Sequence, residues 1–134
     1  MKFRFERQAT EAIKLTWGHG RYLDPWSFVH LLTGFLLGTL TLWLTLSLWQ
    51  SLVVVAILAA MYEVFEFLLG IIEDWQNSLT DILLVILGAW GAFYFLVDAT
   101  TSTRLISFGV VGVAALALLN IGYWYYLRRR MERK

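Results

Sequence analysis

The sequence contains no cysteine among its 134 residues. Disulfide bonds, thiolate metal sites and thiol nucleophiles are therefore excluded together. The chain also lacks a phosphate-binding glycine loop, a nucleophile elbow, a pair of haem ligands and the HExxH motif of zinc proteases. The side chains that remain as candidates for chemistry are histidines and carboxylates.

Charged residues are scarce as well. They make up 16% of the chain, whereas 59% of the residues are hydrophobic and only one residue is proline. A soluble domain of this size could not bury so much apolar surface. We therefore expect a membrane protein whose partners include membrane lipids and not nucleic acid.

The apolar residues gather in four segments, each close to the roughly 20 residues that a helical span requires. These segments are Trp26–Trp49, Ser51–Ile71, Thr80–Val97 and Leu105–Leu127. A helix satisfies its own backbone hydrogen bonds in lipid, so the predicted fold class is all-α: a polytopic bundle of four transmembrane helices. We expect one transmembrane domain, residues 24–127, between a polar segment, 1–23, and a basic tail, 128–134.

The first 23 residues are too polar to span a membrane. Phe5, Ala9, Ala12 and Ile13 recur at helical spacing, which predicts a short amphipathic helix on the membrane surface. A cleavable signal peptide is the competing interpretation. It is disfavoured because the next apolar segment has full spanning length and no small-residue cleavage site precedes it.

The basic residues indicate the orientation of the bundle. All of the 11 lysines and arginines except Arg104 lie before the first apolar segment or after the last one. Under the positive-inside rule both termini are expected in the cytoplasm. The connection at residues 72–79 is expected on the same side, although it carries Glu73 and Asp74 and no base.

Local residue patterns suggest where the helices begin. Pro25 suits the first turn of a helix, where its missing N–H has no partner to lose. Ser78 and Asp81 have the spacing of a capping box for the third helix, and Thr101 or Ser102 could cap the fourth.

Small residues mark places where helices can approach closely. They are Gly34, Gly38, Gly88, Gly91, Gly109 and Gly112. Packing within the chain is the first interpretation of this pattern. Assembly into a homo-oligomer or docking into a larger membrane complex are the alternatives.

Glu63 and Glu66 interrupt an otherwise apolar segment. A carboxylate in hydrocarbon costs several kcal/mol unless it is protonated, paired or hydrated. Such residues usually face a site or a cavity, and these two share one helix face.

The predicted topology brings further polar residues to a similar depth near the cytoplasmic side. The candidate metal ligands are His30, Glu63, Glu66 and Asp81, with Asp74 and Asn77 in supporting positions. Such a cluster can share protons between carboxylates, or it can bind a divalent cation with imidazole as one ligand. Oxygen-rich sites with one imidazole suit Mg, Mn, Fe or Zn, and the pattern does not choose among them.

Structural roles compete with this hypothesis at each position. His30 could donate to a backbone carbonyl or to Glu66, and Asp81 could be a helix cap. Glu66 is close enough to the interface to reach water by extending along the helix. Glu63 is too deep for that escape.

Three strings carry a resemblance to a known group. The strings DPWSFVH from residue 24, YEVFE from residue 62 and DWQNSLTD from residue 74 resemble a family of small, uncharacterised bacterial inner-membrane proteins. That family is distantly similar to VanZ-like membrane proteins, which place a histidine in an early helix and acidic residues in the next two. The resemblance covers residues 24–92 and implies the fold and the location of the site, but no activity. Thr33 stands where the closer group is expected to have a second histidine.

Three classes of function are consistent with the sequence. The first is a membrane protein that binds a cation, protons or a polar lipid headgroup at the histidine and carboxylate cluster. The second is a small accessory subunit of a larger membrane complex. The third is a membrane-embedded, metal-dependent hydrolase or transferase that acts on a lipid-linked substrate. The sequence leaves open whether the protein is an enzyme.

Overall fold

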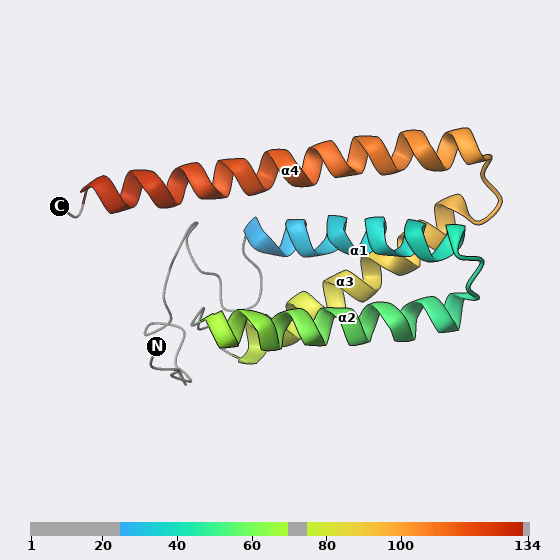
Figure 1. Ribbon diagram of the computed structural model, residues 1–134, viewed down its shortest axis with the longest axis horizontal. Helices are drawn as coiled ribbons and strands as arrows, with labels where there is room; N and C mark the ends of the chain where they lie inside the picture. The colour runs from blue at the N-terminus through green and yellow to red at the C-terminus, as the bar shows by residue number, and fades with distance from the viewer. Residues whose placement is uncertain (1–24, 70–74, 133–134) are drawn as a thin grey trace.

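The computed structural model describes residues 25–69 and 75–132, which form four helices (Figure 1). The helices are α1 (Pro25–Trp43), α2 (Leu48–Leu69), α3 (Trp75–Leu96) and α4 (Thr101–Glu132). Short loops join them, and no strand occurs in these two ranges. The predicted amphipathic segment at residues 1–23 lies outside the described part of the chain.

Each helix contains a segment that is long and apolar enough to cross a membrane. These segments are Trp26–Trp43, Leu48–Leu68, Trp75–Leu96 and Thr101–Trp124. The prediction of an all-α bundle with four spans is therefore confirmed in its architecture, which is that of a multi-pass membrane protein. Pro25 is the first residue of α1, as its missing N–H predicts.

The turn between α1 and α2 comes earlier than hydropathy suggests. We expected the first span to continue to Trp49, but α1 ends at Trp43. Thr45 has a φ of 57°, and the N–H of Leu46 donates to the carbonyl of Thr41 at 3.1 Å. This is the Schellman pattern that ends helices, here with threonine in the left-handed position that glycine usually occupies. Apolar residues on both sides hide the turn from a hydropathy profile.

Helix α2 begins with a reciprocal cap. The backbone N–H of Ser47 donates to Oε1 of Gln50 at 2.9 Å, and the N–H of Gln50 donates to Oγ of Ser47 at 3.4 Å. This capping box satisfies donors that the first turn of a helix leaves without intrahelical partners.

The third helix begins earlier than Thr80, where its apolar run starts. Because α3 begins at Trp75, Ser78 is already inside the helix, so the predicted capping box of Ser78 and Asp81 is wrong. The cap of α4 is Thr100, whose Oγ1 accepts the N–H of Thr103 at 3.2 Å. The cap therefore lies one or two residues before the expected positions, 101 and 102.

The most extensive helix contact joins α1 and α3, which run in the same direction (Figure 1). Gly34 lies against the backbone of Val85, and Gly88 lies against the carbonyl of Leu31. A Cβ on Gly38 would stand 2.7 Å from the Cα of Ala89. These glycines permit the close approach of two backbones, as in other small-residue helix pairs in membranes.

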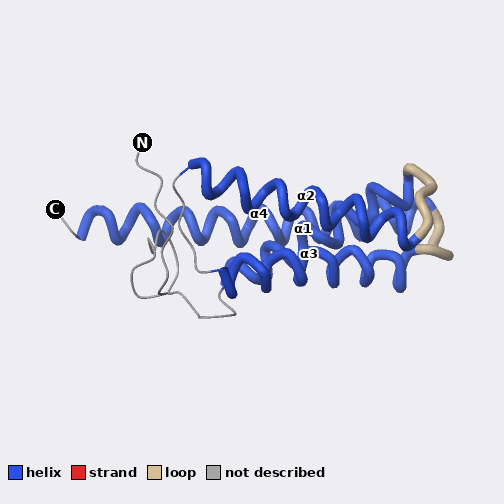
Figure 2. Tube along the Cα trace, turned by 90° about the horizontal axis from the view of Figure 1, so that it is seen from below, coloured by secondary structure: helices blue, strands red, loops and turns tan. Residues whose placement is uncertain are grey.

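The other two helices are more peripheral. Helix α2 packs mainly on α3, and α4 packs mainly on α1. The described loops between the helices gather at one end of the bundle (Figure 2). A Cβ at Gly91, Gly109 or Gly112 would meet nothing within 4 Å. Gly34, Gly38 and Gly88 therefore serve packing between α1 and α3, whereas the glycines at positions 91, 109 and 112 make no such contact within the described residues.

Helix α4 is longer than the others. It has 32 residues, compared with 22 in α2 and in α3. The additional length lies at the end of the bundle where α1 begins (Figure 1). The segment expected as a basic tail from residue 128 thus continues α4 as far as Glu132.

Candidate functional site

The candidate site lies near one end of the bundle, where α1 begins, α2 ends and α3 begins (Figure 1). His30 follows the start of α1 at Pro25 by somewhat more than one turn. Glu63 precedes Leu69, the end of α2, and Asp81 follows Trp75, the start of α3, by nearly two turns each. At 1.5 Å per residue, these positions all lie about 8–9 Å inside the bundle.

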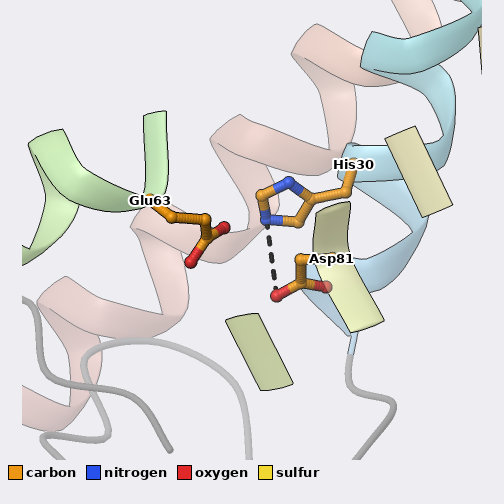
Figure 3. Close-up of side chains that lie close together, drawn as sticks. All are labelled: His30, Glu63 and Asp81. Atoms are coloured by element: carbon orange, nitrogen blue, oxygen red, sulfur yellow. Dashed lines mark ion pairs between the residues drawn. The ribbon is translucent and has the colours of Figure 1, made fainter. Parts of the chain in front are cut away.

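The three side chains meet at this depth. His30, Glu63 and Asp81 each offer one ligand atom, and the three atoms lie within 4.8 Å of one another. They come from three different helices and point toward a common centre (Figure 3). Two atoms that share a metal at about 2.1 Å lie about 3.4 Å apart in a tetrahedral site, so a small contraction of this group would enclose an ion.

Helix register explains why His30 meets Asp81. Gly34 is four residues after His30 on α1, and Val85 is four residues after Asp81 on α3. The side-chain pair His30 and Asp81 therefore lies about one turn before the backbone contact of Gly34 with Val85. Residues four apart share a helix face. The glycine contact therefore fixes both the distance and the orientation of the two ligands.

Asp81 is the most enclosed member of the group, with its side chain 1% exposed. Asn77, one turn earlier on α3, donates from Nδ2 to Oδ2 of Asp81 at 2.9 Å. Ser27 on α1 donates from Oγ to Oδ1 at 3.4 Å. Both carboxylate oxygens are thus held by donors, as a buried carboxylate requires.

His30 lies at the edge of this enclosed region, with its side chain 14% exposed. Its Nε2 is 3.7 Å from Oδ2 of Asp81, which is longer than a normal hydrogen bond. The ring of Tyr62 on α2 meets the imidazole edge to face, with the centroids 6.0 Å apart. This contact adds to the packing that sets the ring orientation of His30.

The predicted site residues separate into two sets. His30, Glu63 and Asp81 come together, and Asn77 supports Asp81. Glu66 is half-buried one turn closer to the end of α2, and it is not a member of the group of ligand atoms found among the described residues. Asp74 lies outside the described residues.

Two residues of the site were missed by sequence reasoning. Ser27 is three residues before His30, so helical spacing could have placed it on the same face. Tyr62 directly precedes Glu63, and no sequence signal distinguishes it from the aromatic residues that anchor spans at the interface.

Residues 25–96, which include all three helical segments around the group, contain neither lysine nor arginine. The nearest donors to Asp81 in the described structure are a neutral amide and a hydroxyl. A divalent cation with a neutral imidazole would balance two ionised carboxylates within the group itself.

No protein-family model, curated protein or solved structure matches this chain. The functional conclusion therefore depends on the geometry of the site.

Proposed function

We propose that this protein is an inner-membrane protein that binds a divalent cation through His30, Glu63 and Asp81. The observation that carries the proposal is the delivery of one ligand atom from each of three helices to within 4.8 Å of one another. An imidazole and two carboxylates suit Zn, Mn, Fe or Mg. The hydrogen bond from Asn77 supplies the outer support that ligating carboxylates commonly have.

We propose that the site lies in the cytoplasmic half of the membrane, as the positive-inside rule predicts for the end of the bundle that carries most of the bases. The described end of α4 lies at the site end, and its last turns carry Arg128, Arg129 and Arg130. Arg104 at the opposite end bonds the carbonyls of Leu96 and Val97 at 2.9 and 2.6 Å. It thereby caps the C-terminus of α3, which gives this base a structural role at the end that we propose to be the outer one.

Elemental analysis of the protein purified in mild detergent tests the proposal. We expect about one divalent metal per chain in the wild type, or after chelation and reconstitution. The Asp81→Asn variant should lose most of this metal while remaining folded. The proposal is overturned if folded wild-type protein binds none of Zn²⁺, Mn²⁺, Fe²⁺ or Mg²⁺.

The three candidate ligands among the described residues support a second candidate, the metal-dependent hydrolase or transferase. Three protein ligands with an open position are typical of catalytic metal sites, because the open position holds the reacting water. Turnover of lipid-linked substrates by the metal-loaded protein would separate this enzyme from a binding protein. The accessory-subunit alternative predicts other chains in the purified particle and no stoichiometric metal.

The resemblance to VanZ-like membrane proteins is consistent with the same arrangement of ligands on three successive helices. We propose that the relationship reflects a shared site and not merely shared hydropathy. Metal analysis of a VanZ-like protein under the same conditions would test this.

A further inference from the structure

Asp81 has two oxygens in different surroundings. Oδ2 accepts the Asn77 amide at 2.9 Å and lies 3.7 Å from Nε2 of His30. Oδ1 accepts the hydroxyl of Ser27 at 3.4 Å. Oδ2 thus faces the imidazole of His30, and Oδ1 is bonded to a side chain on α1.

The two hydrogen bonds to Asp81 come from residues whose positions are set by α3 itself and by the contact of α1 with α3. Asn77 is four residues before Asp81 on α3, so the two side chains share a helix face. Ser27 reaches Asp81 across the α1–α3 contact, where the glycine contacts of Gly34 and Gly88 hold the backbones close. Rotation of the carboxylate would break both hydrogen bonds.

The number of carboxylate oxygens that face an ion affects which ion binds. Ca²⁺ takes six to eight oxygen ligands and commonly uses a bidentate carboxylate, whereas Zn²⁺ and Mn²⁺ accept fewer ligands and an imidazole. A carboxylate that is held to one oxygen favours the second group of ions.

We propose that Ser27 and Asn77 are positioning residues that restrict Asp81 to ligation through Oδ2, so that the site selects Mn²⁺ or Zn²⁺ against Ca²⁺. This inference rests on the proposed function. Asn77 aims Oδ2 at the ion, and Ser27 keeps Oδ1 away from it. Neither residue is itself a ligand.

The test is a comparison of Mn²⁺ and Ca²⁺ affinities, measured by titration of the chelated full-length protein in detergent. The wild type should bind Mn²⁺ at least about 100-fold more tightly than Ca²⁺. Asn77→Leu should lower the Mn²⁺ affinity by about 10- to 100-fold, the usual effect of losing an outer hydrogen bond to a metal ligand. Ser27→Ala removes the hydroxyl that bonds Oδ1 and should reduce the preference for Mn²⁺ over Ca²⁺.

Thr80→Val is the matched control. Thr80 neighbours Asp81 on α3, and its hydroxyl bonds the carbonyl of Gln76 at 2.8 Å within the same helix. This variant should keep both the affinity and the preference of the wild type. A loss of preference in Thr80→Val equal to that in Ser27→Ala would overturn the positioning role.

The selectivity ratio distinguishes this inference from the proposed function. A wild type that binds neither ion contradicts the proposed function and the inference with it. A wild type that binds Ca²⁺ as tightly as Mn²⁺ contradicts the inference alone. If Asn77→Leu does not fold, the ratio of Mn²⁺ to Ca²⁺ affinity in Ser27→Ala still tests the inference, because Ser27→Ala removes only a hydroxyl.

Discussion

Gly34 on α1 lies in backbone contact with Val85 on α3, one helical turn from the point where His30 faces Asp81. A Cβ at position 34 would overlap the carbonyl of Val85, so no side chain larger than hydrogen fits there. This contact couples helix packing to the site. A change that separates the two helices also separates two of the proposed ligands.

Gly34→Ala should therefore destabilise the bundle and weaken metal binding together. Overpacking a tight contact typically costs 1–3 kcal/mol, so we expect a loss of about 2 kcal/mol in unfolding free energy. Gly109→Ala is the control, since a Cβ there would meet nothing within 4 Å. Denaturation in mixed detergent micelles measures the unfolding free energy of both variants. Equal stability of the two variants would show that the glycine contact does not determine packing.

Glu63→Gln and Glu66→Gln should differ in their effects on the site. Glutamine preserves the shape and hydrogen-bonding capacity of glutamate but removes its charge. Each variant therefore distinguishes a role in metal binding from a role in packing. Glu63→Gln should reduce metal affinity by at least about 10-fold, as loss of a ligand must exceed loss of an outer contact. Glu66→Gln should change it less, because Glu66 is outside the ligand group. Metal titration with thermal unfolding of each variant makes the comparison.

If both variants bind metal as the wild type does, the carboxylates of α2 are not ligands. If Glu66→Gln alone loses the metal, the ligand set is different from the one proposed. Both results are informative only when the unfolding temperatures stay close to that of the wild type.

The meeting of His30, Glu63 and Asp81 from three helices could be anticipated because the physical signals are strong. A carboxylate such as Glu63 in an apolar segment is costly, and helix rise together with flanking charge gives its depth. The ends of the helices were less predictable. Thr45 ends α1 through a left-handed conformation that threonine seldom adopts, and Leu44 and Leu46 around it are as apolar as a span.

The start of α3 was missed for the opposite reason. Gln76, Asn77 and Ser78 are polar, which is typical of a loop, yet Asn77 is 1% exposed and its amide donates to Asp81. Polar residues that support a buried ligand look like loop residues in a sequence. The role of Ser27 was hidden in the same way, since a serine in a first helical turn is usually a cap or a surface residue.

Metal should stabilise the bundle because its ligands come from α1, α2 and α3. Binding to the folded state alone adds about 2.7 kcal/mol when the free metal concentration is 100 times the dissociation constant. Chelation should therefore lower the unfolding temperature, and restored metal should return it. Asp81→Asn serves as the control, and it should show little response to either treatment. An equal response in Asp81→Asn would mean that metal acts elsewhere on the chain.

Thr45→Gly should stabilise the turn between α1 and α2. Thr45 holds a φ of 57°, and a β-branched residue pays more for this conformation than glycine does. We expect a gain of about 1 kcal/mol in unfolding free energy, partly offset by the greater freedom of glycine in the unfolded chain. Thr103→Gly should instead destabilise, since Thr103 lies in the first turn of helix α4. Denaturant titration would contradict this account if Thr45→Gly were as harmful as Thr103→Gly.

The orientation of the bundle can be tested directly because the chain has no native cysteine. Single cysteines at Leu46 and Asp98 lie in the two loops opposite the site. One at Lys134 is two residues along the sequence from Glu132, the described end of α4, and that helix end lies at the site end of the bundle. With the site facing the cytoplasm, a membrane-impermeant thiol reagent applied to spheroplasts should label positions 46 and 98, but label position 134 only after lysis. The physical reason is the concentration of bases at the site end, which resists translocation. Labelling of position 134 in intact spheroplasts would invert the bundle and place the proposed metal site on the outer face.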